Sequence, residues 1–334
     1  MLDVSLITTG HLLTFAAVFA GLSAVFAYEA RRKYVYVGVP LAAGLTIAAW
    51  MYLPAGGPRI GFLLATLIVA LIGKMDEFAP LTAKWQLIWQ LAIATVLVVF
   101  GWSIPYVSNP FGAGVLIIPG ILSAALTIGW VLVIMNAVNW LDGADGLASG
   151  VTLMGSIALA AVAMLPGIYN ESALGVALAG AGGLAAFFIW NFPPAKVYLG
   201  TVGSWFVGMF IALAAIIGGG KIATTCLILA LPILDMAFVI LQRLIRRQPI
   251  WRGDTISHMH HRLLRGGVPA KHILAAAIVV TGWFGVMSVL LATTAKLVVV
   301  AAGILGTVVV GVYFWQRIYN EKQIYEDAKP VSRR

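Results

Sequence analysis

The segment IMNAVNWLDGADGLASG, residues 134–150, places four polar side chains directly after a long apolar run. Asn136, Asn139, Asp142 and Asp145 follow one another at intervals of three residues. Amide and carboxylate oxygens are ligands for hard cations such as Mg²⁺, which takes one or two carboxylates together with substrate phosphate oxygens. The glycines of LDGADG stop the helix and let the backbone approach a ligand closely. These residue types and their spacing predict part of a metal–phosphate site.

Three further segments hold side chains suited to the same chemistry. GKMDEFAPLTAKWQ contains Asp76, Glu77 and Lys84, and NFPPAKVYLGTVGS contains Lys196. The third segment, SHMHHR, holds a basic group: His258, His260, His261 and Arg262. Cationic side chains form strong hydrogen bonds to phosphate oxygens. We therefore expect acidic and amide groups for a cation and basic groups for phosphates.

The histidine cluster has two interpretations. It could bind zinc, but a zinc site needs three or four ligands in tetrahedral geometry. The one cysteine of the chain, Cys226, lies in an apolar run and supports no such site. Histidines beside an arginine in a basic segment favour phosphate binding.

The elements that must position these residues are membrane-spanning helices. Of the 334 residues, 61% are hydrophobic and 10% charged, and apolar segments long enough to cross a hydrocarbon core of roughly 30 Å recur along the chain. We predict an all-α polytopic integral membrane protein with a single domain over residues 1–334 and about 11 crossings. The expected crossings are 4–28, 35–53, 58–73, 86–103, 115–138, 148–167, 173–191, 202–219, 222–245, 272–293 and 297–316.

The basic residues predict the orientation. No basic residue precedes the first apolar segment and Arg31 and Arg32 follow it, which is the reverse of a cleavable signal, so we expect a retained helix with its N-terminus outside. Nearly all of the 21 Lys and Arg then lie on the cytoplasmic side with the C-terminus, as the positive-inside rule requires. The exceptions are Arg59, Lys221 and Lys296. The net charge of +9 therefore reflects topology in the cytoplasmic (inner) membrane and does not indicate nucleic acid.

Other interpretations exist for single residues and for the whole chain. Glu77 could be a solvated charge at a helix end. Asp235 lies within an apolar segment, where ionisable residues are functional candidates, but it could also make a packing hydrogen bond. A transporter would place its ion site near the bilayer midplane on repeated, broken helices. Here the carboxylates gather at one face and no repeat is visible, which favours a surface site.

The four motifs resemble those of the polyprenyl-phosphate N-acetylhexosamine-1-phosphate transferase family. NAVNWLDGADGLASG is similar to the family's most specific motif, and NFPPAKVYLGTVGSWFVG to its Pro-Pro-Ala-Lys and Gly-Asp-x-Gly-Ser stretches. GKMDEF…LTAKWQ resembles the aspartate-pair loop, and HMHHRL the late histidine loop. The matches follow the family order over about residues 60–270, and the eleven-helix topology with an outside N-terminus also fits.

The resemblance implies a reaction at the cytoplasmic face. The phosphate of a polyprenyl phosphate attacks the β-phosphorus of UDP-N-acetylglucosamine, UMP leaves, and a lipid-diphosphate-sugar for cell-wall biogenesis remains. It implies Mg²⁺, or Mn²⁺ in its place, as cofactor. UDP-N-acetylglucosamine, polyprenyl phosphate and membrane lipid are the implied partners, and the oligomeric state, a homodimer included, stays open. Direct attack is favoured over a covalent aspartyl-phosphate, because a phosphate monoester with a second pKa of about 6 is already largely dianionic.

By position, the resemblance assigns roles to the residues. Asp76 and Glu77 form the acidic pair expected in catalysis, with Asp76 at the lipid phosphate. Asn139 and Asp142 match metal-binding positions, and Asp142 and Asp145 match acidic positions that organise nucleotide and metal. The histidine loop is expected to contact the diphosphate, with His258 as its catalytic member. The residues expected to bind substrate are Lys84, Asn136, Lys196, His260, His261 and Arg262.

The sequence departs from the family pattern at three places. The acidic pair is Asp76-Glu77, VPLAAG has Leu41 where arginine is usual, and GTVGS has Thr201 in place of the metal-binding aspartate. A threonine hydroxyl can ligate Mg²⁺ but brings no charge. The His-x-His-His-Arg form indicates the N-acetylglucosamine-1-phosphate branch. The alternatives are the phospho-N-acetylmuramoyl-pentapeptide branch, which has three consecutive histidines, and a catalytically impaired paralogue or variant.

Overall fold

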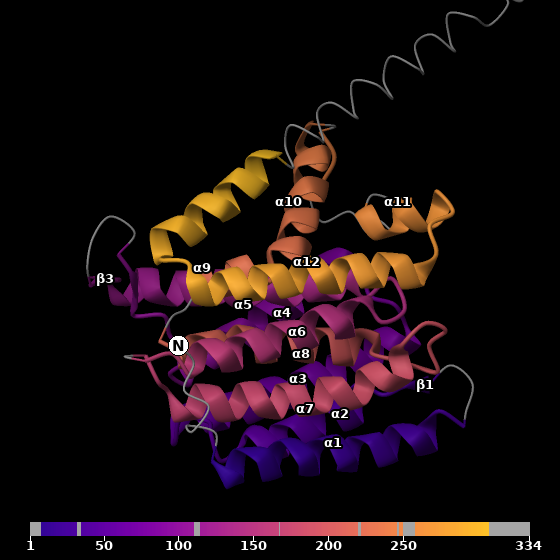
Figure 1. Ribbon diagram of the computed structural model, residues 1–334, viewed down its shortest axis with the longest axis horizontal. Helices are drawn as coiled ribbons and strands as arrows, with labels where there is room; N and C mark the ends of the chain where they lie inside the picture. Colours follow the sequence, from indigo (N-terminus) through magenta and orange to yellow (C-terminus); the bar gives the residue numbers. More distant parts are fainter. Residues whose placement is uncertain are drawn as a thin grey trace, which may run out of the picture.

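Helices form nearly all of the described structure, a computed structural model (Figure 1). It describes residues 8–31, 35–109, 114–166, 168–219, 222–245, 247–249 and 258–306. The helices of the first half are α1 (Thr9–Glu29), α2 (Gly38–Ala49), α3 (Gly57–Phe78), α4 (Ala83–Val99), α5 (Gly120–Leu141) and α6 (Leu147–Ala163). Those of the second half are α7 (Glu171–Asn191), α8 (Gly200–Ile217), α9 (Ile222–Ile228), α10 (Ala230–Ile245), α11 (Met259–Arg265), α12 (Ala270–Leu290) and a helix over Thr293–Gly306.

Among the described residues, six helices are long and apolar enough to cross a membrane: α1, α3, α5, α7, α8 and α12. The bent pair of α9 and α10 would add a seventh span, and α2, α4, α6 and the Thr293–Gly306 helix are shorter apolar helices. The predicted all-α, multi-pass membrane protein is confirmed. The eleven crossings and the sides of the two termini stay predictions, and the expected crossing 297–316 lies partly outside the described residues.

Helices α7 and α8 form the interior of the bundle. Of their most apolar stretches, 72% and 78% are buried, against 17% for α1. Small residues permit such close helix packing. Gly73 of α3 faces the backbone at the start of α8, where an added Cβ would lie 2.9 Å from the Cα of Val202. A larger residue there would push α3 away from α8 and would displace Asp76, which lies one turn further along α3.

Helix α3 is longer than expected at its C-terminal end. It continues to Phe78, so Asp76 and Glu77 lie in its last turns and not in a loop. In the short loop that follows, Leu81 N–H donates to the Asp76 carboxylate at 2.7 Å, and this bond ties the chain back to α3. The acidic pair therefore stands on a rigid helix.

Two further boundaries differ from the expected ones. α5 begins only at Gly120, after Pro119, and the residues before it form a strand. The expected crossing 222–245 is bent by 84° between α9 and α10. Pro232 lies in the first turn of α10, where proline is tolerated, whereas the interior of one continuous helix would lose a hydrogen bond there.

Two short strand pairs join segments that are distant in sequence. β1 (Val35–Tyr36) pairs in parallel with β4 (Val197–Tyr198), just before α2 and α8 begin. β2 (Tyr106–Ser108) pairs antiparallel with β3 (Val115–Ile117). Strands of two or three residues are too short for a sequence period to reveal. The first pair matters for function because it holds the segment before α8 beside the segment before α2.

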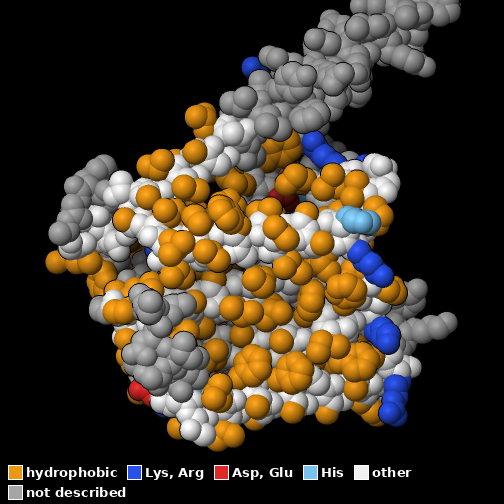
Figure 2. All heavy atoms as spheres, viewed as in Figure 1, with side chains coloured by type: hydrophobic (Ala, Val, Ile, Leu, Met, Phe, Trp, Pro, Cys, Tyr) orange, Lys and Arg blue, Asp and Glu red, His pale blue; other side chains and the backbone are white. Residues whose placement is uncertain are grey.

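Basic side chains gather at one end of the helices. Figure 2 shows Lys and Arg atoms in a column along the edge at which α11 and β1 lie in Figure 1. Hydrophobic side chains cover the flank between this edge and the opposite one. An apolar flank with one basic end is typical of a membrane protein that follows the positive-inside rule.

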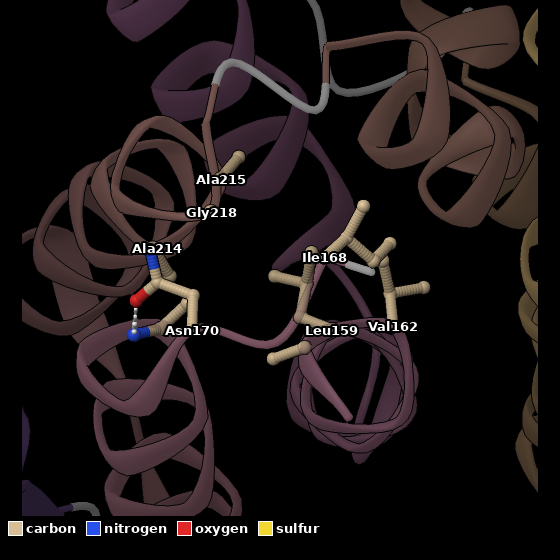
Figure 3. A pocket seen from close by; sticks show the side chains of 9 residues that line it. Leu159, Val162, Ile168, Asn170, Ala214, Ala215 and Gly218 are labelled. Carbon is tan, nitrogen blue, oxygen red and sulfur yellow. Dashed lines mark hydrogen bonds between the residues drawn. The ribbon is translucent and has the colours of Figure 1, made fainter. Parts of the chain in front are cut away.

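The opposite end contains a small pocket between the ends of α6 and α8 and the start of α7 (Figure 3). Its volume is about 10 Å³, roughly the space of a single water molecule. Asn170 is the polar side chain in its wall; it caps α7 by accepting from Ala173 N–H at 2.8 Å and donates to the Ile217 carbonyl at 3.0 Å. The pocket is therefore a packing feature of the helix ends.

Candidate active site

The sequence motifs meet around a cavity at the basic end of the helices. The cavity has a volume of about 370 Å³ and lies where the ends of α5 and α7 meet the start of α8. Its lining residues are Tyr36, Asn139, Asp142, Gly143, Ala144, Asp145, Asn191, Tyr198, Gly200, Thr201 and Ser204. Two segments singled out in the sequence, NAVNWLDGADG and GTVGS, thus face one space.

Asp142 is the carboxylate that faces this cavity without a protein partner. α5 ends at Leu141, as the following glycines predict, and Asp142 takes the C-cap position. Within the described part of the chain, its half-buried side chain makes no hydrogen bond or ion pair. Burial raises the pKa of Asp142 well above its ordinary value, because desolvation disfavours the charged form. A cation in the cavity would offset that penalty.

Thr201 and Asp76 contact each other although 125 residues separate them. The Thr201 hydroxyl donates to Oδ2 of Asp76 at 2.6 Å. The same carboxylate accepts from Gln86 Nε2 at 3.1 and 3.2 Å, in addition to Leu81 N–H. Asp76 is buried and its oxygens are largely occupied, so here it fixes the end of α3 and the orientation of Thr201.

Asn139 is held in the cavity wall by α8. Its Oδ1 accepts from the Ser204 hydroxyl at 2.8 Å, and Ser204 lies one turn after Thr201. An amide oxygen and a hydroxyl oxygen each have two lone pairs, so Asn139 and Thr201 retain the capacity to approach a cation. With Asp142 they form a donor set of one carboxylate and two neutral oxygens. That set fits Mg²⁺ completed by substrate phosphate oxygens.

Glu77 points to the backbone at the start of α8. Its Oε2 accepts from Lys74 Nζ at 3.0 Å, and its Oε1 accepts from Val202 N–H at 3.4 Å. Gly200, at φ +66°, leaves room for this carboxylate. A side chain at position 200 would occupy the same space as the Glu77 carboxylate. Glu77 is thus a paired carboxylate and not a freely solvated charge.

Asp145 and Asn191 join the two loops that close the cavity. Asp145 Oδ2 accepts from Ala195 N–H at 2.9 Å. The buried Asn191 accepts from Gly146 N–H at 3.0 Å and donates to the Val197 carbonyl at 2.9 Å. These bonds tie the backbone that follows Asp142 to residues 191–197, so Asp145 has a structural contact here in addition to its position in the cavity wall.

The histidines of α11 lie against the loop that contains Asp142. An added Cβ on Gly143 would meet His260 Nε2 and His261 Nε2 at 2.5 and 2.7 Å, so only glycine lets both rings sit here. Burial, with the neighbouring His261 second, lowers the pKa of His260 to about 4, and the ring is neutral near pH 7. Its buried Nε2 has no hydrogen-bond partner in the described part of the chain. Both rings therefore pack against Gly143, which lines the cavity.

His258, the N-cap residue of α11, stacks on the His260 ring with centroids 5.8 Å apart and also contacts α10 and α5. Its Nδ1 lies 2.7 Å from Oδ2 of Asp235, and its ring meets Trp140 edge-on with centroids 5.1 Å apart. Asp235 Oδ1 also accepts from Met259 N–H at 2.8 Å. Among the described residues, no three His, Cys, Asp or Glu side chains converge as a metal cluster. The α11 histidines thus divide between an anchor, His258, and a pair beside the cavity.

Known proteins are similar to this chain over about two thirds of its length. A model described as "Glycosyl transferase family 4" matches residues 59–219. The chain is 31% identical over 235 residues to a "Probable undecaprenyl-phosphate N-acetylglucosaminyl 1-phosphate transferase" of Bacillus subtilis, covering 67% of this chain and 63% of that protein. It is 31% identical over 234 residues to a "Phospho-N-acetylmuramoyl-pentapeptide-transferase" of Streptococcus thermophilus, covering 65% of this chain and 67% of that protein. The chain belongs to the polyprenyl-phosphate N-acetylhexosamine-1-phosphate transferase family.

A third member of the family, the "Decaprenyl-phosphate N-acetylglucosaminephosphotransferase" of Mycobacterium leprae, is 28% identical over 261 residues. That match covers 70% of this chain and 63% of the relative. The chain therefore spans less than two thirds of the length of the Bacillus and Mycobacterium members that it matches. The family membership expected from the four motifs is confirmed.

None of the six residues expected from the family motifs to bind substrate lines the cavity; His260 and His261 lie next to it, against Gly143, and the other four point elsewhere. Asn136 donates to Gln90 Oε1 at 2.6 Å and so faces α4. Lys84 is exposed at the start of α4, and Lys196 Nζ lies over the Trp190 ring. Arg262 donates to Gln242 at 2.8 Å and stacks on Phe238 of α10. Their predicted substrate roles have no geometric support from the cavity.

Other cavity residues escaped the sequence analysis of this family member. Ser204 orients Asn139, and Asn191 orders the loops, but single Ser and Asn residues give no distinctive signal. Tyr36 and Tyr198 lie opposite each other in the β1–β4 register. That pairing joins segments some 160 residues apart, roughly half the chain, and only the structure reveals it.

Proposed function

We propose that this protein transfers N-acetylglucosamine 1-phosphate from UDP-N-acetylglucosamine to a polyprenyl phosphate at the cytoplasmic membrane face. The observation that supports it most is the Asp142 carboxylate, which faces a 370 Å³ cavity beside Asn139 and Thr201 and has no partner among the residues that the structure describes. The Bacillus and Mycobacterium relatives are named for transfer of N-acetylglucosamine phosphate to polyprenyl phosphates. The basic edge of the molecule supports the cytoplasmic orientation.

The reaction is a phosphoryl transfer in which positioning and electrostatics provide most of the rate. An oxygen of the lipid phosphate forms a bond to the β-phosphorus of the UDP-sugar. The bond from that phosphorus to the bridging oxygen breaks, and UMP leaves with the oxygen and its electron pair. Mg²⁺, when bound, would offset the negative charge of the diphosphate.

The residues of this chain would divide the work. Asp142, Asn139 and Thr201 would hold the cation, with Asp142 as the only charged ligand of the three. His260 and His261 would donate hydrogen bonds to the diphosphate from the edge of the cavity. Asp76 already accepts hydrogen bonds from Thr201 and Gln86. We therefore propose that Asp76 orients Thr201 and fixes the end of α3, and that it does not form a covalent phosphate intermediate.

The second candidate within the family is phospho-N-acetylmuramoyl-pentapeptide transfer, favoured by the Streptococcus relative. The His-x-His-His-Arg form of α11 favours the N-acetylglucosamine donor. A competition assay separates the two. Purified protein receives polyprenyl phosphate, Mg²⁺ and an equimolar mixture of the two UDP-sugars, each with its own radiolabel. We expect the N-acetylglucosamine label in the lipid extract. Preferential transfer of the muramoyl label would replace the proposal with the second candidate.

A further inference from the structure

Asp235 of α10 is a buried carboxylate that the proposed reaction does not use. It is 6% exposed and accepts two hydrogen bonds, from His258 and from the Met259 N–H. A buried carboxylate is costly unless hydrogen bonds or an opposite charge stabilise it. Both of its partners belong to the segment that starts α11, 23 and 24 residues along the chain. Asp235 therefore ties that start to the middle of α10.

The bond also fixes the His258 ring. Asp235 Oδ2 lies 2.7 Å from Nδ1, which places the proton on a defined side and sets the plane of the imidazole. The ring then meets the Trp140 indole edge-on at 5.1 Å. Trp140 lies in the last turn of α5, two residues before Asp142. The Asp235–His258 pair thus connects α10 and α11 to the end of α5.

A second residue of α10, Arg243, contacts the Trp140 ring. The Arg243 guanidinium lies 5.2 Å from its centroid, and Arg243 is 4% exposed. A cation over the face of an indole ring is attracted by the ring's quadrupole, and more strongly when the cation is desolvated. We call Asp235, His258, Trp140 and Arg243 the α10 clasp. It fixes α11 at a point two residues before His260.

We infer that Asp235 is a positioning residue: the α10 clasp holds α11 so that His260 and His261 rest on Gly143 beside Asp142. The inference rests on the proposed function only for its kinetic consequence. The fit on Gly143 has no slack, since an added Cβ would lie 2.5 Å from His260 Nε2. A small rotation of α11 would therefore remove both imidazoles from the cavity edge, whereas the fold of the remaining helices does not depend on the pair.

The first test does not need transfer activity. Purified protein is treated with diethyl pyrocarbonate, which acylates accessible imidazole nitrogen, and each histidine is followed by mass spectrometry. His260 is 3% exposed and should react slowly, whereas the exposed His272 provides the internal reference. We expect His260 to react about tenfold faster in Asp235→Asn, as the loss of a charged hydrogen bond opens the segment locally. Met236→Leu, a volume-conserving change beside Asp235, should match the parent.

A second variant keeps the inference testable if Asp235→Asn fails to fold. His258→Gln removes the imidazole end of the same pair and should raise the His260 rate to a similar extent. Unchanged His260 rates in folded Asp235→Asn or His258→Gln would overturn the inference. A parent protein without transfer activity but with these rate changes would overturn the proposed function and leave the positioning role standing.

The kinetic test asks whether Asp235 acts through His260. We expect kcat/KM for the UDP-sugar to fall about tenfold in Asp235→Asn and in His260→Ala, since a positioned charge-assisted contact is lost in both. In a protein that already carries both His260→Ala and His261→Ala, adding Asp235→Asn should lower kcat/KM by no more than about twofold further, because both positioned imidazoles are already absent. A further tenfold loss in that combined variant would show that Asp235 acts independently of the two histidines and would refute the inference.

Discussion

At the scale of single residues, the cavity combines one carboxylate that lacks a protein partner with neutral oxygens that are already oriented. Asn139 is fixed by Ser204, and Thr201 is fixed by Asp76. Asp142 has no such contact within the described residues and its pKa is raised by burial. A carboxylate whose charged form is disfavoured by burial gains most when a cation binds beside it. The charge of Asp142 should therefore matter more than its shape.

Asp142→Asn tests this directly. The asparagine keeps the size of the side chain but loses the charge, so we expect transfer to fall on the order of 10²-fold or more while the protein stays folded. Transfer is measured as radiolabel in the lipid extract, and folding as the thermal unfolding midpoint in detergent. Near-normal turnover in a well-folded Asp142→Asn protein would remove Asp142 from the mechanism.

Thr201→Asp restores the carboxylate that the family motif contains. We expect higher transfer and a lower Mg²⁺ requirement, because the cation would then have two charged ligands. Without metal, the new carboxylate would lie beside Asp76, whose Oδ2 is now 2.6 Å from the Thr201 hydroxyl, so like charges should destabilise the metal-free variant.

The measurement is a Mg²⁺ titration of transfer in the two proteins side by side. Thr201→Asn is the matched control, since it adds the bulk of the side chain without its charge. If Thr201→Asp is no more active than Thr201→Asn and needs as much metal, Thr201 is not at the cation.

At the scale of elements, the packing around α11 buries His260 and so links the protonation of this side chain to folding. The pKa of His260 is about 4 in the folded protein, against about 6.5 in an unfolded chain. Below pH 6.5 the unfolded chain binds a proton that the folded protein does not bind until about pH 4. The contribution of His260 to stability is therefore full above pH 6.5 and is lost as the pH falls toward 4.

The unfolding midpoint of metal-free protein should thus fall between pH 7 and pH 4.5 more steeply in the parent than in His260→Gln. Glutamine keeps a polar side chain but does not titrate. Other groups, Asp142 included, titrate in both proteins, so the difference between the two curves reports His260. Parallel curves would mean that α11 does not bury a neutral imidazole.

The elements also show what sequence reasoning could reach. The end of α5 at Leu141 follows from the glycines of LDGADG, and the helical segments follow from apolar length. The direction of Asn136 did not follow. At about 100° per residue, Asn136 and Asn139 are about 60° apart around α5, enough for one to face α4 and the other α8.

Contacts between segments that are distant in the sequence could not be predicted from its physical patterns alone. Asp76 and Thr201 were brought to one site by resemblance to the family, and their hydrogen bond confirms that they are adjacent. Asp235 stood out only as an ionisable residue in an apolar segment, and its partner His258 became visible in the structure. Pairings of this kind depend on how helices pack, which local patterns do not encode.

At the scale of the whole molecule, the cavity, the α11 histidines and the basic edge all lie at one end of the helices. The predicted topology makes that end cytoplasmic, which is the side on which the proposed UDP-sugar donor would bind. The other end holds the small Asn170 pocket, whose volume of about 10 Å³ is far below the 370 Å³ of the cavity. Orientation is therefore part of the functional proposal.

Thiol labelling in intact cells tests the orientation. Cys226 is the one native cysteine and is first replaced by alanine. A single cysteine is then introduced at exposed positions of the two ends, Glu171→Cys or Lys271→Cys. We expect a membrane-impermeant maleimide to label Glu171→Cys in intact cells and Lys271→Cys only after permeabilisation. The reverse pattern would invert the topology and place the cavity outside.

The central claim is that this family member moves N-acetylglucosamine 1-phosphate onto a polyprenyl phosphate with the cation held at Asp142. The most direct measurement follows the radiolabelled sugar into lipid and quantifies UMP in the same reaction, with purified parent protein. We predict one UMP per labelled lipid, and no product when either polyprenyl phosphate or Mg²⁺ is left out. UMP without labelled lipid, labelled lipid without added divalent cation, or no product at any Mg²⁺ concentration would contradict the account.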